Sequence, residues 1–181
     1  GRGGRNMLTL VIGENNSGKS RWAEQYAAAN REGRLVYLPT MIAADEPSLE
    51  RIARHRRQRR GLGFITLELP LNLCQAEIEP DDTVLVEDIS NLLANQLFAH
   101  QTAANTPAVP AQLQNLCGRC GQVIAVTIGG LQPSREYDAA TNAYIAALNQ
   151  LNAELADCAE LVVEMAAGRP LVRKGAIPCR C

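Results

Sequence analysis

Short apolar segments alternate with longer amphipathic segments along most of the chain. The short ones are rich in Val, Ile and Leu, as buried strands are, and they span residues 7–12, 35–38, 64–68, 83–87, 121–127 and 160–165. The segments 20–30, 45–60, 91–100 and 137–156 are predicted helices, the first with Ala residues and Trp22 at helical spacing and the second with Asp45, Glu46 and Pro47 at its start. This alternation predicts one α/β domain with a mostly parallel sheet covered by helices on both faces.

The two ends of this pattern differ from its middle. A turn at residues 167–169 leads into an apolar segment at 170–173, which predicts an antiparallel C-terminal strand. We expect a single domain over residues 7–175, a flexible tail over 1–6 and a cysteine-containing tail over 176–181.

Residues 101–110 are rich in Thr, Ala, Asn and Pro, which predicts a surface loop.

Composition excludes several classes of protein. The 181 residues carry 18 basic and 19 acidic side chains, for a net charge of -1, and only 4% are aromatic. This balance disfavours a nucleic-acid partner. No apolar run approaches the ~20 residues that a membrane span needs. The polar segment before the first strand, residues 1–6, is too short and too polar to be a secretory leader. We therefore expect a cytoplasmic protein without a membrane span.

The first strand leads into a glycine-rich loop that matches the pattern G-x-x-x-x-G-K-[ST]. A strand precedes this loop and a helix follows it, as a phosphate-binding loop requires, so the sequence predicts a P-loop NTPase-like fold. We expect Lys19 to reach the β- and γ-phosphates of a nucleotide and the Ser20 hydroxyl to bind Mg²⁺. The candidate nucleotide-binding residues of the loop are Gly13, Glu14, Asn15, Asn16, Ser17, Gly18, Lys19 and Ser20.

A second metal ligand is expected where a neighbouring strand ends. The apolar strand at 83–86 runs into Glu87 and Asp88, and either carboxylate could face the phosphates. We favour Glu87 as the metal ligand, together with Ser20.

Six arginines crowd the ten residues from Arg51 to Arg60. Such a run can be a solvated helix face, a nucleic-acid stripe or a clamp for a triphosphate, because guanidinium groups match phosphate oxygens. His55 lies among these arginines and is one of two histidines in the chain. The surrounding cations favour the neutral imidazole, the form that can attack phosphorus.

Six cysteines allow two interpretations. Cys117, Cys120, Cys179 and Cys181 could supply four thiolates to zinc, but the spacing of the second pair is tight for such a site. Free thiols are favoured, because cytosolic cysteines stay reduced.

The order of these motifs resembles the bifunctional adenosylcobinamide kinase / adenosylcobinamide-phosphate guanylyltransferase family of cobalamin biosynthesis. The resemblance covers Met7 to about Phe98 and, more weakly, Val126 to Lys174. It rests on the glycine-rich loop with Arg21 and Ala23-Glu24, then Tyr37-Leu-Pro-Thr40, Arg51-Ile-x-x-His55-Arg56, Phe64-x-Thr66-x-Glu68, Glu87 and Asn95-x-Leu97-Phe98.

The resemblance implies two reactions and a set of residues for them. A nucleoside triphosphate, ATP or GTP, would phosphorylate the hydroxyl of adenosylcobinamide, with Lys19 as a catalytic residue. His55 would take GMP from GTP and pass it to the cobinamide phosphate, which gives adenosylcobinamide-GDP. The family also implies a homotrimer, small-molecule substrates including a corrinoid, and Mg²⁺. Besides the loop, the implied nucleotide-site residues are Pro39, Thr40, Met41, Arg56, Arg57, Gln58, Arg59, Glu68 and Glu87.

The second half of the chain departs from the family pattern. Where the family has Asn-Glu-Val-Gly, this chain has Ile128-Gly-Gly-Leu131, and Ile145-Ala146 replaces an Arg-Asp pair. Two alternatives therefore stay open. One is a diverged P-loop kinase or nucleotide-binding paralogue with a different acceptor, and the other is a non-catalytic module that binds nucleotides or nucleic acids through the arginine run.

Overall fold

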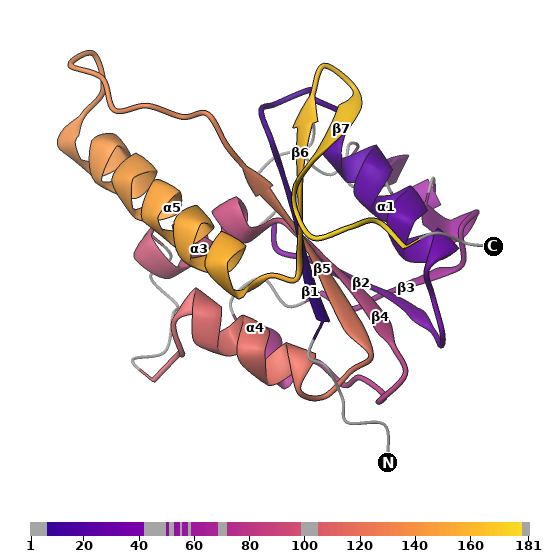
Figure 1. Cartoon of the computed structure of the whole chain (residues 1–181). Coiled ribbons are helices and arrows are strands. Elements are labelled where there is room, and N and C mark those ends of the chain that lie inside the picture. The colour runs from indigo at the N-terminus through magenta and orange to yellow at the C-terminus, as the bar shows by residue number, and fades with distance from the viewer. Residues whose placement is uncertain are drawn as a thin grey trace.

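A computed structural model describes residues 7–41, 50, 53–54, 56–57, 59–68, 72–98 and 105–178. Within these residues one seven-stranded sheet runs through the molecule in the order β3-β2-β4-β5-β1-β6-β7 (Figure 1). The first six strands are parallel, and β7 pairs antiparallel with β6. The predicted mostly parallel sheet and its antiparallel last strand are therefore confirmed. The strands are β1 Met7–Gly13, β2 Leu35–Pro39, β3 Phe64–Thr66, β4 Thr83–Glu87, β5 Gln122–Ile128, β6 Leu161–Ala166 and β7 Arg169–Lys174.

Helices cover both faces of this sheet. Helix α1 lies on one face, and α3, α4 and α5 lie on the other (Figure 1). The described residues between 50 and 60 are also helical, whereas 45–49 of the predicted helix lie outside the described residues. The helices with full bounds are α1 Lys19–Ala29, α3 Ile89–Phe98, α4 Val109–Cys117 and α5 Ala139–Cys158, with a short 3₁₀ turn, η1, at Leu73–Gln75.

The core is divided by the sheet, because successive side chains of a strand point to opposite faces. In β1, Leu8 and Leu10 pack in the cluster below α3, α4 and α5, whereas Val11 packs in the cluster below α1. Both faces of the central strands are covered, so these strands are apolar at nearly every position, as the sequence analysis assumed.

The prediction of a loop over 101–110 is wrong at its C-terminal end. Helix α4 begins at Val109, and no helix was predicted there. Pro110 lies in its first turn, where a missing N–H costs no intrahelical hydrogen bond. The helix is held by burial of Val109, Leu113 and Leu116, which recur at helical spacing and pack on the sheet.

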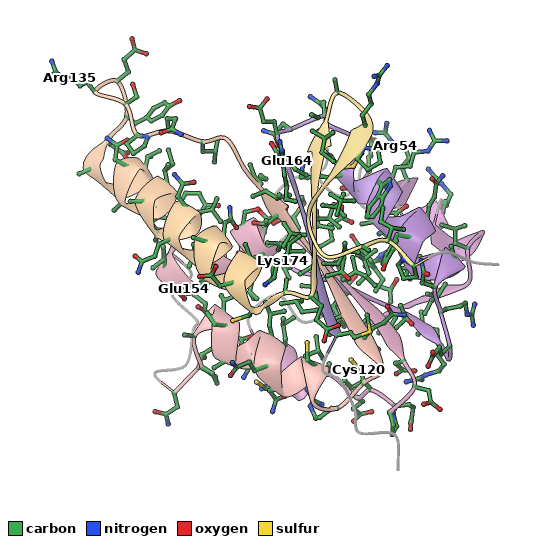
Figure 2. All side chains as sticks on the ribbon, in the orientation of Figure 1. Arg54, Cys120, Arg135, Glu154, Glu164 and Lys174 are labelled. Carbon is green, nitrogen blue, oxygen red and sulfur yellow. The ribbon has the colours of Figure 1, made fainter. Side chains whose placement is uncertain are left out.

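The residues before β1, those after β7 and the connection before α5 lie outside the regular elements. The predicted tail over 1–6 and residues 179–181 lie outside the described residues, and 176–178 are exposed after β7. The segment between β5 and α5 projects away from the sheet, with Arg135 at its tip (Figure 2). Among the described residues, no helix combines the length and the apolar character needed to cross a membrane.

Candidate functional site

The glycine-rich loop joins the end of β1 to the start of α1. Gly18 forms the N-cap of the helix, so the first helical N–H groups point toward the loop. The Ser17 N–H donates to the Glu14 carbonyl at 3.2 Å, and the Lys19 ammonium donates to the same carbonyl at 3.2 Å. The loop thus curls around a point in front of the helix N-terminus, which is the arrangement that binds phosphate groups.

The inside of the loop has no room for an additional side chain. A Cβ atom at position 13 would come within 2.4 Å of the Ser17 hydroxyl and 3.0 Å of the Met165 carbonyl. The Ser17 hydroxyl is buried and has no hydrogen-bond partner within the described part of the chain. A buried hydroxyl without a partner is costly, so the loop keeps an unsatisfied polar atom beside its first glycine.

The turn between β6 and β7 supports the loop from the far end of the sequence. The Gly168 N–H donates to the Ser17 carbonyl at 3.0 Å, and the turn lies beside the loop in Figure 1. Sequence reasoning did not assign this turn to the site. Its only sequence signal is the pair Ala167-Gly168, which predicts a hairpin turn but not its contact.

The sheet register brings the end of β4 to the same edge as the loop. Gly13 pairs with Ile128 of β5, and Glu87 pairs with Val126 of β5, so β1 and β4 end at similar heights on either side of β5. Ligands of open parallel sheets bind at this carboxyl edge. The structure therefore places the glycine-rich loop and the end of β4 at one edge.

Glu87 and Asp88 have different partners. The Tyr37 hydroxyl donates to Glu87 Oε2 at 2.9 Å. Asp88 Oδ1 accepts from the Ser90 hydroxyl at 2.9 Å and from the Asn91 N–H at 2.6 Å, so its carboxylate caps α3. Burial raises the pKa of Asp88, and the hydrogen bonds from Asn91 and Ser90 and the charge of Lys19 oppose this rise.

The end of β2 adds a rigid connection to β4. Pro39 pairs with Glu87 in the sheet, and the Thr40 N–H donates to the Glu87 carbonyl at 3.0 Å. The buried Thr40 hydroxyl bonds the backbone on both sides of Asp88, at 2.6 Å to its carbonyl and 2.8 Å from its N–H. Met41, the last described residue before 50, is partly buried.

The arginine-rich segment is described in part. Arg56 forms an ion pair with Glu68, and Arg57 is exposed. His55 and Gln58 lie outside the described residues. The structure thus joins two predicted site residues, Arg56 and Glu68, while the predicted roles of these residues stay predictions.

Arg59 differs from the other described arginines because it is buried. Its guanidinium carbon lies 3.5 Å from the centre of the Tyr37 ring, and its Nη1 lies 3.6 Å from Glu24 Oε1. Burial, followed by the nearby Glu87 carboxylate, raises the pKa of Glu24 to about 7, and Arg59 opposes this rise. Burial and the same carboxylate raise the pKa of Tyr37 well above its usual value. Sequence reasoning did not predict this contact, because it joins elements far apart in the chain.

The donor atoms at this edge are oxygens. The Ser20 hydroxyl and the Glu87 carboxylate are the ligand types that Mg²⁺ prefers, so the residues present fit this ion. The described residues contain no group of three or more His, Cys, Asp or Glu side chains arranged to hold a metal.

The four described cysteines lie away from this edge. Cys74, Cys117, Cys120 and Cys158 are free thiols. Burial raises the pKa of Cys117 to about 11 and that of Cys120, with the nearby Cys117 as a second cause, to about 12. Both thiols are therefore protonated at neutral pH. The predicted zinc alternative also requires Cys179 and Cys181, which lie outside the described residues.

Comparison with known proteins identifies relatives over most of the chain. A family model described as "Cobinamide kinase / cobinamide phosphate guanyltransferase" matches residues 9–172. The bifunctional adenosylcobalamin biosynthesis protein CobP of Pseudomonas aeruginosa is 33% identical over 175 residues, which cover 93% of this chain and 98% of that protein. The corresponding protein CobU of Escherichia coli K12 is 32% identical over 137 residues, covering 67% of this chain and 74% of that protein.

A solved structure supports the fold alone. The flagellar accessory protein FlaH of Methanocaldococcus jannaschii is similar with a TM-score of 0.55 at 13% identity, over 94% of this chain and 79% of that one. The glycine-rich loop at the sheet edge agrees with this P-loop NTPase-like architecture. By the extent of the family match and the identity to its members, the chain belongs to the cobinamide kinase / cobinamide phosphate guanyltransferase family of cobalamin biosynthesis.

Proposed function

We propose that this protein phosphorylates adenosylcobinamide and then transfers GMP from GTP to the product, which gives adenosylcobinamide-GDP. The observation that carries the proposal is the loop Gly13–Ser20, with its buried, unpartnered Ser17 hydroxyl, at the same sheet edge as Glu87. A loop of this shape binds a polyphosphate through backbone N–H groups, which suits both reactions.

The triphosphate would be held mainly by the loop and the start of α1. Lys19 is free to exchange its 3.2 Å bond to the Glu14 carbonyl for phosphate oxygens, which carry more charge. Arg56 and Arg57 would contribute further positive charge, and Pro39, Thr40, Met41 and Glu68 would line the nucleotide. Ser20 and Glu87 would hold Mg²⁺, which neutralises charge on the phosphates when bound.

In the kinase step, the acceptor hydroxyl oxygen would form a bond to the γ-phosphorus. The bond between that phosphorus and the β–γ bridging oxygen breaks, the nucleoside diphosphate leaves, and the hydroxyl proton passes to solvent. Lys19 would stabilise the charge on the transferred group, because little covalent chemistry is needed beyond positioning and electrostatics.

In the transferase step, a ring nitrogen of His55 would attack the α-phosphorus of GTP. The bond to the α–β bridging oxygen breaks, pyrophosphate leaves, and the other ring nitrogen releases its proton. An oxygen of the cobinamide phosphate then attacks the same phosphorus, the nitrogen–phosphorus bond breaks, and the ring takes back one proton from solvent to restore the neutral imidazole. A covalent intermediate divides one displacement between two anions into two easier steps.

The test is a labelling experiment with α-³²P-GTP and Mg²⁺. The wild-type protein should acquire label that is labile in acid and stable in base, and His55→Ala should abolish it. The only other histidine of the chain, His100, provides a matched control, since His100→Ala should be labelled like wild type. An unlabelled wild-type protein, or label that survives in His55→Ala, would contradict the transferase half.

A different acceptor is the second candidate, and the segment after β5 favours it. A Cβ atom at position 130 would lie 2.7 Å from the Glu14 carboxylate of the glycine-rich loop, so the segment that departs from the family pattern lies against the loop. Kinase assays with adenosylcobinamide and a series of unrelated alcohols would decide between the two. Preference for adenosylcobinamide would rule out the second candidate.

We also propose that the protein is a homotrimer, as the family resemblance implies. Light scattering on the purified protein should give a mass near three times the 19.6 kDa of the chain. A monomeric mass at micromolar concentration would contradict the trimer without affecting the proposed reactions.

A further inference from the structure

A buried cation joins the arginine-rich segment to the rest of the site. The Arg59 side chain is only 4% exposed, and that of its partner Glu24 is 10% exposed. The guanidinium carbon lies over the Tyr37 ring, 3.5 Å from its centre, and the Tyr37 hydroxyl reaches Glu87 at 2.9 Å. Four side chains from four separate parts of the fold therefore form one contact network.

The energetics of this network indicate a specific role. Removing a guanidinium from water costs several kcal/mol, and a single carboxylate at 3.6 Å offsets this cost incompletely. The Arg59 Nε atom is buried and has no hydrogen-bond partner among the described residues. Apolar side chains at both positions 24 and 59 would pack with less penalty than this buried pair, so overall stability does not explain the pair.

The elements that meet at Arg59 are those that carry the proposed chemistry. Glu24 lies one helical turn after Ser20 on α1, the helix that begins in the glycine-rich loop. Tyr37 of β2 holds the Glu87 carboxylate through its hydroxyl. Arg59 follows His55 by four residues in the chain, and the described residues on both sides of position 55 are helical.

We propose that Arg59 is a positioning residue for the transferase step, which attaches the arginine-rich segment (residues 50–60) to α1 and thereby sets the place of His55 relative to the bound triphosphate. Glu24 supplies the charged contact and Tyr37 the flat surface on which the guanidinium is held. This inference rests on the proposed function for its chemistry, but the attachment itself is a property of the fold. In this proposal Arg59 acts through the segment, in place of the direct nucleotide contact that the family resemblance implies for it.

Two measurements on one set of variants test this role. The first is the single-turnover rate of GMP attachment at saturating GTP, and the second is the dissociation constant for GTP. Arg59→Met removes the charge and keeps an unbranched side chain, Arg59→Lys keeps the charge without the planar group, and Glu24→Gln removes the partner's charge. Arg60→Met, at an exposed position of the same segment, controls for the loss of one arginine.

We expect Arg59→Met to lower the attachment rate at least tenfold and to leave the GTP dissociation constant within threefold of wild type. A displaced nucleophile reduces the rate steeply, whereas a loop that binds phosphate elsewhere keeps its affinity. Arg59→Lys and Glu24→Gln should also lower the attachment rate. The double variant Glu24→Gln/Arg59→Met should be no slower than Arg59→Met, because the two changes break the same contact. Arg60→Met should react like wild type.

Hydrogen exchange supplies a readout that does not depend on catalysis. Amides of residues 50–60 should exchange faster in Arg59→Met, while those of β1, β4 and β5 keep their protection. A wild-type attachment rate together with unchanged exchange in Arg59→Met would overturn the inference. A tenfold higher dissociation constant for GTP in Arg59→Met would overturn it too, because it would indicate that Arg59 contacts the nucleotide directly. A wild-type protein that acquires no label would overturn the proposed function instead, and exchange would still decide whether Arg59 holds the segment.

Discussion

At the scale of single residues, Glu24 is the side chain with the most consequential environment. It is a carboxylate on α1 that pairs with Arg59 of the arginine-rich segment and lies close enough to Glu87 of β4 for the two charges to interact. Burial and the charge of Glu87 together outweigh the pairing with Arg59, so the pKa of Glu24 lies at about 7 rather than at its ordinary 4.5. The carboxyl therefore takes up and releases its proton in the physiological range.

This pKa predicts a pH-dependent contribution to stability. The folded state holds the Glu24 proton more tightly than the unfolded chain does, so the contribution is fully present below pH 4.5 and is lost as the pH rises through 7. Glu24→Gln cannot titrate. We therefore expect the unfolding free energy of wild type, relative to that of Glu24→Gln, to decrease between pH 5 and pH 8 in urea titrations with a chelator.

Glu32→Gln, at an exposed carboxylate, controls for the general loss of one negative charge. A difference between wild type and Glu24→Gln that stays constant from pH 5 to pH 8 would show that the carboxyl does not titrate in this range.

At the scale of elements, the junction between α5 and β5 depends on one buried amide. The Thr127 hydroxyl donates to Asn152 Oδ1 at 2.7 Å, and Asn152 Nδ2 donates to the Ile128 carbonyl at 2.9 Å. Asn152 is 7% exposed and Thr127 is fully buried. The helix is thus fixed to the last residues of β5, immediately before the segment that departs from the family pattern.

Replacing this amide should destabilise the protein. Asn152→Leu leaves the Thr127 hydroxyl and the Ile128 carbonyl without partners, and each buried unsatisfied group costs ~1–3 kcal/mol, so we expect a loss of about 2–4 kcal/mol. Gln150→Leu, on the exposed side of the same helix, should stay within about 0.5 kcal/mol of wild type. Chemical denaturation measures both. Equal effects of the two substitutions would show that the buried amide does not fix the helix.

The elements also show where sequence patterns are sufficient and where they are not. Strands such as β1 and β4 could be predicted because burial on both faces leaves long apolar runs at their positions. Helix α4 was missed because Pro110 and the preceding Thr-rich residues favoured a loop, although Val109, Leu113 and Leu116 carry a helical spacing. The loop Gly13–Ser20 could be predicted because its chemistry is contained in eight consecutive residues. The contact of Arg59 with Glu24 could not, because it depends on how distant elements pack.

At the scale of the whole molecule, the sheet brings its functional parts to one edge. The parallel strands β1 and β4 end beside β5, which places the glycine-rich loop and Glu87 within one region. The loop at this edge is also bonded to the β6–β7 turn, because the Gly168 N–H donates to the Ser17 carbonyl. Binding is therefore expected to stabilise the entire domain rather than a single segment.

Nucleotide binding should raise the melting temperature accordingly. At GTP and Mg²⁺ concentrations of about 100 times the dissociation constant, linkage gives ~2.7 kcal/mol, which corresponds to about 5–10 °C for a domain of this size. Lys19→Met should remove most of this shift at the same GTP concentration. The only other lysine, Lys174, contacts the Ala156 and Asp157 carbonyls at the end of α5, so Lys174→Met should keep the shift even if its own melting temperature falls. Differential scanning fluorimetry measures all three proteins, and a full shift in Lys19→Met would contradict the role of this lysine.

The hydrogen bond from Gly168 to Ser17 has a consequence for biosynthesis. The turn that buttresses the glycine-rich loop is translated about 150 residues after the loop, and β5 and β6, the partners of β1, are also translated after it. A nascent chain interrupted before the last hairpin would carry every residue of the phosphate motif and still lack the finished cradle. The cradle is thus completed only after the β6–β7 hairpin has been synthesised.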